Sequence, residues 1–402
     1  MTSTLPSPHP KLSASSGTPK ILVVTRTFLP AAGGIEDYVY SRCLQEPDNV
    51  AVLSAACPGD KSFDAQQTFP VYRWPMPPLP KVKGLTGILK QIIYLIWEFI
   101  QVIRLTVRDR YAVVEWCHGY DFLSLLLISY LLPVRCCLYL HGNDLLCPLR
   151  NPLLRSLFAL TLNRMDRVVC NSHFTQGYLK THFKLSVPTV VINPTVRPEK
   201  FGELPTVEAT QQLRQTYSIP AEAIILLSVG RLVPRKGFET IIALMPELIE
   251  QGLDIHYLIC GKGKQKSELV SLTAQLGLTE RVHFAGYVPD SQLAAHYLAC
   301  DIFALPTFFN ASDQSIEGYG IVYAEAGYFG KPVIACDVGG VADAVKHNEN
   351  GLMISPNHPE ELPKAIRQLC QDPELRARLG KRGRALALRD QSFKDLYATS
   401  GM

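Results

Sequence analysis

The sequence predicts an α/β protein built of two doubly wound parallel sheets. Short apolar strands alternate with helical stretches in two separate runs of the chain, and no fixed-period repeat links the runs. Some of these strands are followed by a glycine turn that opens a helix, as at Gly33-Gly34 and Gly339-Gly340. The chain of 402 residues is long enough for two domains, and its hydrophobic content of 47% is enough for two cores.

Shifts in composition divide the chain into five segments. We expect a disordered tail at 1–19, an N-terminal domain at 20–197, a linker at 198–220, a C-terminal domain at 221–385 and a C-terminal tail at 386–402. The first tail is rich in Ser, Pro and Thr and contains no apolar segment, so we do not expect a secretory signal.

Charge and cysteine content exclude several classes of protein. The formal net charge is only +4, which does not favour nucleic acid as a partner. The eleven cysteines are scattered, with no CxxC pair and no His/Cys spacing typical of a metal site. We therefore expect reduced thiols in a cytoplasmic protein, with no metal and no cofactor.

Two histidines follow strands of the first run. His118 comes after the strand expected at 111–116, and His141 directly follows the strand expected at 134–140. The carboxyl ends of parallel strands face the ligand crevice of such sheets, whereas a lone histidine is more often structural. The other strands that we expect in this run are at 20–25, 50–54, 71–74, 167–171 and 190–193.

The stretch 85–110 predicts one long helix. Residues 81–110 contain six Lys or Arg against two acids, and charged residues interrupt an otherwise apolar run. A helix that spans a membrane needs about 20 nearly uncharged residues, so we do not predict one. The pattern favours peripheral contact with an anionic membrane face, and the alternative is a core helix with a basic end.

The second run opens with a strand at 223–229 and a basic turn. This turn has the sequence Gly-Arg-Leu-Val-Pro-Arg-Lys-Gly from Gly230 to Gly237. Cations at a helix N-terminus can bind a diphosphate, and the alternative is a solvated basic loop. Further strands are expected at 256–260, 282–284, 301–306 and 332–336, and further helices at 359–371 and 373–389.

The stretch 310–340 brings two carboxylates close to one helix. Glu317 lies in a polar loop before a helix expected at 321–329, and Glu325 lies about two turns inside it. An acid in an apolar helix is costly unless it is hydrogen-bonded, and a polyhydroxylated ligand would supply the donors. The alternative is that Glu317 caps the helix and Glu325 pairs with a buried arginine.

Several motifs together resemble the retaining family 4 glycosyltransferases, which have the GT-B fold. They are Glu317-Gly318-Tyr319-Gly320, Glu325-Ala326, the run 330–335, Gly339-Gly340, the turn 230–237 and the strand that ends in His141-Gly142. The resemblance covers most of residues 20–385 and is strongest in 223–355. It implies two Rossmann-like domains that face each other across a cleft.

The resemblance implies a role for each matched residue. Arg231 and Lys236 would bind the donor diphosphate and stabilise it as it leaves, while Glu325 would hold ribose hydroxyls. The expected catalytic residues are His141, Arg231, Lys236 and Glu317. The expected nucleotide-sugar-binding residues are Gly33, Gly34, Arg231, Lys236, Val288, Glu317, Gly318, Tyr319, Gly320, Ile321 and Glu325.

The implied activity is transfer of a hexose, with mannose favoured, from a nucleoside-diphosphate sugar to a lipid or glycan acceptor, with retention of the anomeric configuration. The run E-G-x-G-I-V-Y-x-E-A looks closest to enzymes that use GDP-mannose, and a UDP-sugar is the alternative donor. Two other functions remain open, a sugar-nucleotide epimerase of the same fold and a non-catalytic sugar-nucleotide-binding subunit. We expect a cytoplasmic location, with peripheral membrane contact through residues 81–110.

Overall fold

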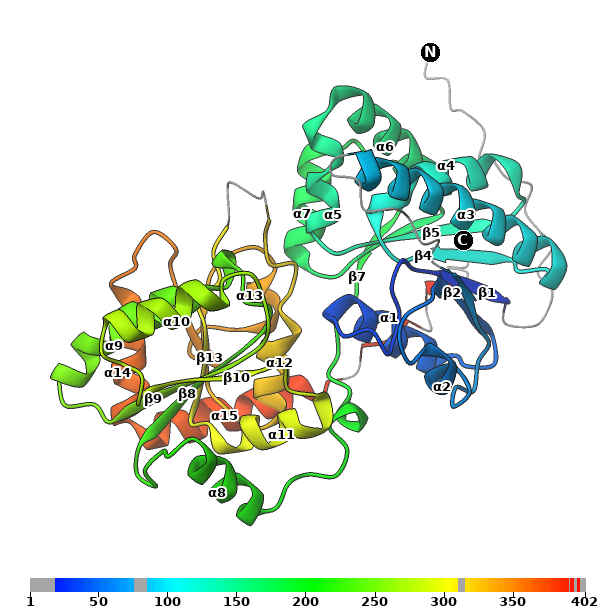
Figure 1. Ribbon diagram of the computed structural model, residues 1–402. Helices are drawn as coiled ribbons and strands as arrows, with labels where there is room; N and C mark the ends of the chain where they lie inside the picture. The colour runs from blue at the N-terminus through cyan, green and yellow to red at the C-terminus, as the bar shows by residue number, and fades with distance from the viewer. Residues whose placement is uncertain (1–18, 76–84, 310–314, 390, 394–395, 398–402) are drawn as a thin grey trace. The chain divides into compact units, whose positions relative to one another are not determined.

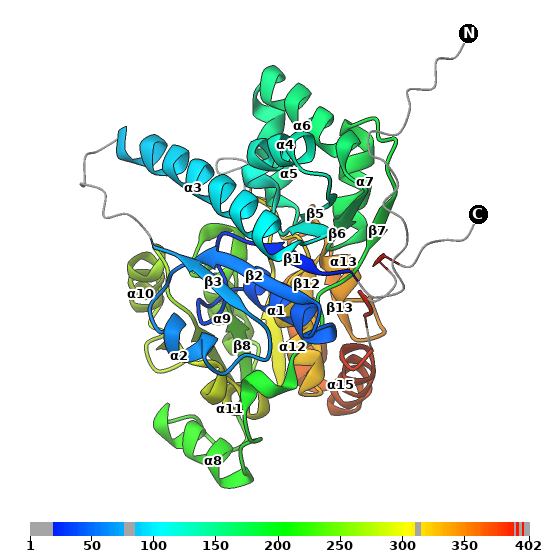
Figure 2. The same ribbon diagram turned by 90° about the vertical axis from the view of Figure 1, so that its right-hand side faces the viewer.

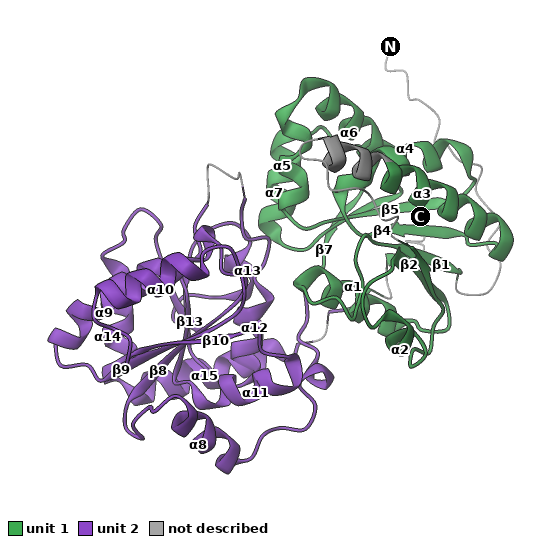
Figure 3. Ribbon diagram, viewed as in Figure 1, with its two compact units in different colours: residues 1–192, 392–402 green, residues 193–391 purple. Residues whose placement is uncertain are grey.

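The computed structural model describes residues 19–75, 85–309, 315–389, 391–393 and 396–397. The chain forms two compact units, of which unit 1 contains residues 1–192 and 392–402 and unit 2 contains residues 193–391 (Figure 3). The tail predicted at 1–19 lies outside the described residues except for its last position. Each unit is an α/β domain with a parallel sheet, as predicted.

Unit 1 has, in its described residues, a sheet of seven parallel strands (Figure 1). The strand order is β3-β2-β1-β4-β5-β6-β7, so the direction of winding reverses between β1 and β4. Ligands bind at the carboxyl ends of the strands on either side of such a switch point. The strands are β1 (Ile21–Val24), β2 (Val50–Ala55), β3 (Val71–Trp74), β4 (Val113–Trp116), β5 (Arg135–Leu140), β6 (Arg167–Cys170) and β7 (Thr189–Val191).

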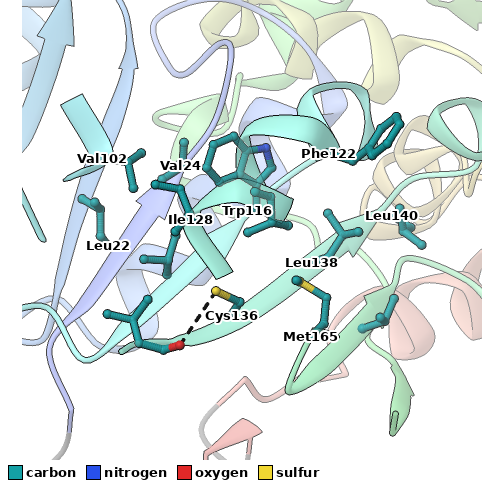
Figure 4. Packing of buried hydrophobic residues seen from close by; sticks show 14 of the residues in the cluster. Leu22, Val24, Val102, Trp116, Phe122, Ile128, Cys136, Leu138, Leu140 and Met165 are labelled. Carbon is teal, nitrogen blue, oxygen red and sulfur yellow. Dashed lines mark hydrogen bonds between the residues drawn. The ribbon is translucent and has the colours of Figure 1, made fainter. Parts of the chain in front are cut away.

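Helices cover both faces of this sheet, because side chains alternate along each strand. On β1, Leu22 and Val24 belong to a core shared with α3, α4 and α6, whereas Ile21 and Val23 belong to a core shared with α1. Figure 2 shows α3 and α1 on opposite faces of the sheet. Figure 4 shows the first core, in which side chains of β1, β4, β5 and α3 pack around Trp116. The helices are α1 (Gly34–Gln45), α2 (Asp60–Asp64), α3 (Leu85–Asp109), α4 (Phe122–Leu131), α5 (Asn143–Leu146), α6 (Pro152–Arg164) and α7 (His173–His182), with short 3-10 turns η1 (Gly119–Asp121) and η2 (Pro148–Arg150).

The long helix predicted at 85–110 is α3. Val102 of α3 lies in the first core, whereas Ile96, Trp97 and Ile100 are exposed. None of the helices that the structure describes combines the length and the apolar character needed to cross a membrane.

Unit 2 has, in its described residues, a sheet of six parallel strands in the order β10-β9-β8-β11-β12-β13. Its switch point therefore lies between β8 and β11. The strands are β8 (Ile224–Val229), β9 (Ile255–Cys260), β10 (Val282–Gly286), β11 (Ile302–Leu305), β12 (Val333–Cys336) and β13 (Gly351–Ile354). The helices are α8 (Val207–Thr216), α9 (Phe238–Glu250), α10 (Lys266–Gln275), α11 (Asp290–Ala299), α12 (Ile321–Tyr328), α13 (Val341–Ala344), α14 (Glu361–Gln371) and α15 (Pro373–Ala387), with 3-10 turns η3 (Pro198–Phe201) and η4 (Pro234–Lys236).

The predicted linker at 198–220 differs from the structure. This segment belongs to unit 2 and contains η3 and α8. Phe201 is completely buried, and its ring packs on those of Tyr297 and Phe329 with centroids 6.2 and 4.8 Å away. Burial of this aromatic ring fixes a segment that composition alone suggested to be a connector.

The predicted tail at 386–402 also differs from the structure. Beyond α15, Phe393 and Leu396 are buried in the second core of unit 1. The hydroxyl of Tyr397 donates a hydrogen bond of 2.5 Å to Glu115, a fully buried residue of β4. The three apolar residues at 393, 396 and 397 thus form one face that docks on unit 1.

Candidate active site

The loops that follow β8 and β11 meet at the switch point of unit 2. The N–H of Phe308, just beyond β11, donates a hydrogen bond of 2.9 Å to the carbonyl oxygen of Arg235 in η4. The connection from β11 to α12 then brings Glu317 to the same place, although residues 310–314 of that connection lie outside the described residues. The predicted phosphate-binding turn and the predicted acidic loop are therefore brought together at the edge where such sheets bind ligands.

A glycine holds the basic turn against β11. Gly237 follows η4 with φ of 74°, in the left-handed region, and a Cβ atom there would collide with the carbonyl oxygen of Pro306. Only glycine fits this backbone approach without strain. Arg235 and Lys236, on the turn itself, are 8% and 7% exposed.

Both buried cations bind Glu317. The Nζ of Lys236 lies 2.5 Å, and the NH1 of Arg235 lies 2.8 Å, from the same carboxylate oxygen, Oε2. Burial alone would raise the pKa of Glu317, but the Lys236 and Arg235 charges lower it to about 2. The carboxylate is therefore ionised at neutral pH.

The pKa of Lys236 is lowered as well, but for Lys236 the charged partner acts against the shift. Burial lowers its pKa, and the charges of Arg235 and Arg231 act in the same direction, against the attraction of Glu317. Arg231 is exposed and, among the residues that the structure describes, forms no ion pair. Two cations therefore bind one carboxylate, and the charge of a third, Arg231, acts on Lys236, so that this excess of positive charge favours a ligand with at least two negative charges.

The backbone around Glu317 is also fixed. Its carbonyl oxygen accepts a 2.9 Å hydrogen bond from the N–H of Gly340. Gly339 has φ of 64°, and a Cβ atom there would collide with that carbonyl oxygen. The Gly339-Gly340 turn, which the sequence placed before a helix, thus supports the loop that carries the predicted carboxylate.

Glu325 is bound within unit 2. Its Oε1 accepts a 2.5 Å hydrogen bond from the Nζ of Lys200, and its Oε2 accepts a 2.8 Å bond from the hydroxyl of Tyr297. The side chain is 3% exposed. The ion pair with Lys200 is close to the alternative in which Glu325 pairs with a buried arginine. The contact of Glu325 with ribose hydroxyls stays a prediction.

The other predicted donor-binding residues of unit 2 lie around the same edge. Gly318 and Gly320 are buried and Gly320 precedes α12, which begins at Ile321. Tyr319 is half-buried, and burial together with Asp343 raises its pKa. Val288 is half-buried in the loop after β10.

The predicted residues of unit 1 lie at the edge of the other sheet. Gly33 and Gly34 open α1. His141 follows β5, is 9% exposed, and donates through Nε2 to the carbonyl oxygen of Cys117 at 2.9 Å. Because a carbonyl can only accept, Nε2 carries the proton and Nδ1 is the acceptor. Burial lowers the pKa of His141, so the ring is neutral at pH 7.

Sequence reasoning missed a second polar cluster, at the switch point of unit 1. Asp121 accepts two hydrogen bonds from the Arg26 guanidinium, and the Nε2 of His118 accepts a 3.0 Å bond from the Arg26 N–H. Glu98 of α3 is 2% exposed, and its Oε1 has no partner among the described residues. The sequence drew attention to His118 alone, because Arg26 and Glu98 lie far from it in the chain and join it only through the fold.

In the structure this cluster binds Arg26. One ligand atom each of Glu98, His118 and Asp121 lie within 4.8 Å of one another. However, Arg26 already occupies the lone pair of His118 and both oxygens of Asp121. Burial lowers the pKa of His118 to about 4, and burial with the Asp121 charge raises that of Glu98 well above its usual range.

Comparisons with known families match both halves of the chain. Residues 32–200 match the model of glycosyltransferase family 4, and residues 209–386 match that of glycosyl transferases group 1. The two matches meet near the boundary between the two units.

Curated relatives include two mannosyltransferases. A GDP-mannose-dependent alpha-(1-6)-phosphatidylinositol monomannoside mannosyltransferase of Mycolicibacterium smegmatis is 30% identical over 59% of this chain and 61% of its own length. The GDP-mannose-dependent monoacylated alpha-(1-6)-phosphatidylinositol monomannoside mannosyltransferase of Corynebacterium glutamicum is 27% identical over 92% of this chain and 93% of its own. The chain thus spans about three fifths of the first relative and nearly all of the second.

Solved structures share the fold over most of the chain. Anabaena HepE in complex with UDP superposes with a TM-score of 0.73 at 21% identity, over 92% of this chain and 94% of that one. Sucrose-phosphate synthase from Thermosynechococcus elongatus gives a TM-score of 0.73 at 22% identity, over the same shares.

Proposed function

Because the chain belongs to the family 4 glycosyltransferases of the GT-B fold, we propose that it transfers a hexose from a nucleoside-diphosphate sugar to an acceptor, with retention of the anomeric configuration. Mannose is the favoured hexose and GDP-mannose the favoured donor, since relatives are named for that donor. A UDP-sugar is the alternative donor.

The observation that carries this proposal is the charge balance at the switch point of unit 2. Arg235 and Lys236 both bind the single carboxylate of Glu317, and the charge of Arg231 acts on Lys236. A diphosphate would offset the two surplus positive charges, and the N-terminal end of the following helix favours an anion as well. An exposed basic loop would instead leave all of its cations in solvent, whereas Arg235 and Lys236 are buried.

These residues suit the breaking of a sugar–phosphate bond. As the bond between the anomeric carbon and the phosphate oxygen breaks, positive charge develops on the ring and negative charge on the diphosphate. Lys236 and Arg231 would stabilise the departing diphosphate. The leaving phosphate would take the proton of the acceptor hydroxyl, and that hydroxyl would attack from the same face.

Glu317 would orient the donor sugar. Both of its cation contacts go to Oε2, and Oε1 has no hydrogen-bond partner among the described residues. An ionised oxygen with no partner can accept hydrogen bonds from sugar hydroxyls. We assign no covalent nucleophile, because the role of Glu317 is binding.

Calorimetric titration of GDP and UDP into the protein tests the donor site, with Lys236→Ala as the control. The proposal expects GDP to bind and the variant to lose that binding. Preference for UDP would keep the transferase and change the donor, whereas binding of neither nucleotide by folded protein would overturn the proposal. Proton NMR of the product anomeric signal then tests retention.

A lipid acceptor and peripheral membrane contact complete the proposal. On α3, Ile96, Trp97 and Ile100 are 54%, 39% and 45% exposed, and Arg104 and Arg108 are exposed on the same helix. An amphipathic helix of this composition binds anionic bilayers. The named relatives act on phosphatidylinositol mannosides, which are lipids.

Flotation with vesicles tests this contact. We expect binding to vesicles that contain anionic lipid and not to neutral ones, and we expect Ile96→Ser with Ile100→Ser to abolish it. The matched control is Val270→Ser, which removes a valine that is 43% exposed on α10 of unit 2. Equal flotation of both variants would contradict membrane contact through α3.

A further inference from the structure

Two cations share one oxygen at the centre of the proposed donor site. Arg235 NH1 and Lys236 Nζ both contact Oε2 of Glu317, at 2.8 and 2.5 Å. All three side chains are mostly buried, with exposures of 9%, 9% and 13%. The resemblance assigned roles to Arg231 and Lys236 and left position 235 unassigned.

In the proposed reaction, Glu317 and the donor diphosphate compete for the ammonium group of Lys236. The ammonium group that stabilises the leaving diphosphate is the same group that holds Glu317. A buried carboxylate that loses its only cation is strongly destabilised, so Lys236 could not turn to a phosphate without a substitute. Arg231 is exposed and has no contact with Glu317 among the described residues, which leaves Arg235 as the cation able to stay.

The position of Arg235 is fixed by its own backbone. Its carbonyl oxygen accepts the N–H of Phe308 at 2.9 Å, and Gly237 closes the turn against Pro306. A guanidinium also remains charged at any physiological pH, whereas the pKa of Lys236 is lowered in this environment.

We propose that Arg235 is a positioning residue, which keeps Glu317 ionised and in place when Lys236 turns to the donor diphosphate. This inference rests on the proposed function. Without Arg235, Lys236 would remain the only partner of Glu317 and would be held away from the phosphates. Removing Glu317 as well would release Lys236 again.

A double-mutant cycle on GDP binding tests the inference. We expect Arg235→Met to weaken GDP binding by at least about tenfold, because Lys236 would then be the only cation bound to Glu317 and could not turn to the diphosphate. Glu317→Gln alone completes the cycle, and we expect it to weaken GDP binding less than Arg235→Met does. We expect the double variant to recover most of the loss, so that the second substitution improves the first.

Two further variants serve as controls. Arg235→Lys keeps a cation at this position and should retain most of the binding. If Arg235→Met lowers the melting temperature markedly, Arg235→Gln, which keeps much of the side-chain length, is carried through the same cycle. A residue needed only for folding would not be rescued by a second substitution.

Three outcomes overturn the inference. Wild-type binding in Arg235→Met would show that Lys236 needs no substitute. Equal loss in Arg235→Met and in the double variant would show that Arg235 binds the diphosphate itself. Both results leave the proposed function standing, whereas a wild-type protein that binds neither GDP nor UDP overturns the proposed function and this inference with it.

Discussion

The two sheets of this protein have the same winding but differ in charge at their switch points. In unit 1, Arg26 is paired with Asp121, and burial favours the neutral forms of His118 and Glu98, so the cluster has no excess of positive charge. In unit 2, Arg235 and Lys236 bind Glu317 and the charge of Arg231 acts on Lys236, so positive charge is in excess. The fold places polar groups at both edges, but the side chains decide which edge attracts an anion.

The largest expected effect comes from removing one cation at each edge. We expect Lys236→Ala to weaken GDP binding by on the order of 100-fold or more and to abolish turnover, because a preorganised cation is lost. Arg26→Ala should leave GDP binding within about twofold, although it removes the cation that pairs with the buried Asp121 carboxylate. Calorimetry on both variants makes the comparison, and an equal loss in both would refute it.

The next effect concerns the turn that supports Glu317. Gly339→Ala should lower the free energy of unfolding of unit 2 by about 2–3 kcal/mol, because a Cβ atom at positive φ also collides with the Glu317 carbonyl. Gly252→Ala is the control, since its φ is 87° and its Cβ would meet nothing within 4 Å. Urea unfolding gives the free energy of unfolding of each variant. The loss in Gly252→Ala reports backbone strain alone, and the additional loss in Gly339→Ala reports the collision.

The two edges should respond to pH in opposite ways. The stabilisation from Glu317 is present above its unfolded pKa of about 4.3 and is lost as the pH falls toward 2. The pKa of Glu98 is raised in the folded state, so its contribution is present below about pH 4.3 and is lost as the pH rises through the folded value.

Substitution by glutamine tests these signs. At pH 7, Glu98→Gln should stabilise unit 1 by about 1 kcal/mol, and Glu317→Gln should destabilise unit 2 by about 2 kcal/mol. The Glu98 effect should shrink at pH 4. Hydrogen exchange measured on peptides of each unit reads the two effects separately, and shifts of the same sign would contradict the comparison.

The smallest expected effect concerns the C-terminal segment of unit 1. Tyr397→Phe should lower the free energy of unfolding of this unit by about 1 kcal/mol, because Glu115 loses a 2.5 Å hydrogen bond. Tyr130→Phe, in a side chain that is 58% exposed, is the matched control and should change little. Equal changes would mean that the Tyr397 hydroxyl adds nothing to docking.

Strands were the easiest elements to predict. Those expected at 20–25, 223–229 and 332–336 agree with β1, β8 and β12 to within one residue at each end, because buried parallel strands are continuous apolar runs. Strand β13 (Gly351–Ile354) was not predicted. It is short and begins at a glycine that lies against the backbone of Val333, a contact that no local pattern reveals.

Polar partners were the hardest to predict. The sequence pointed to Glu317 and Lys236 by their motifs, but the bond of Arg235 to Glu317 joins residues 82 positions apart. Lys200 binds Glu325 across 125 positions, from a segment expected to be a linker. Such pairs depend on how loops converge at a sheet edge, which neither periodicity nor composition encodes.

Local sequence patterns were enough to predict the two α/β domains, the strand ends near Lys236 and Glu317 and the resemblance to a family, because apolar periodicity and glycine turns are local signals. Only the tertiary structure decided which charges meet. The sharing of Glu317 by Arg235 and Lys236, and the closed pair of Arg26 and Asp121, follow from the parallel strands that bring distant loops to one edge.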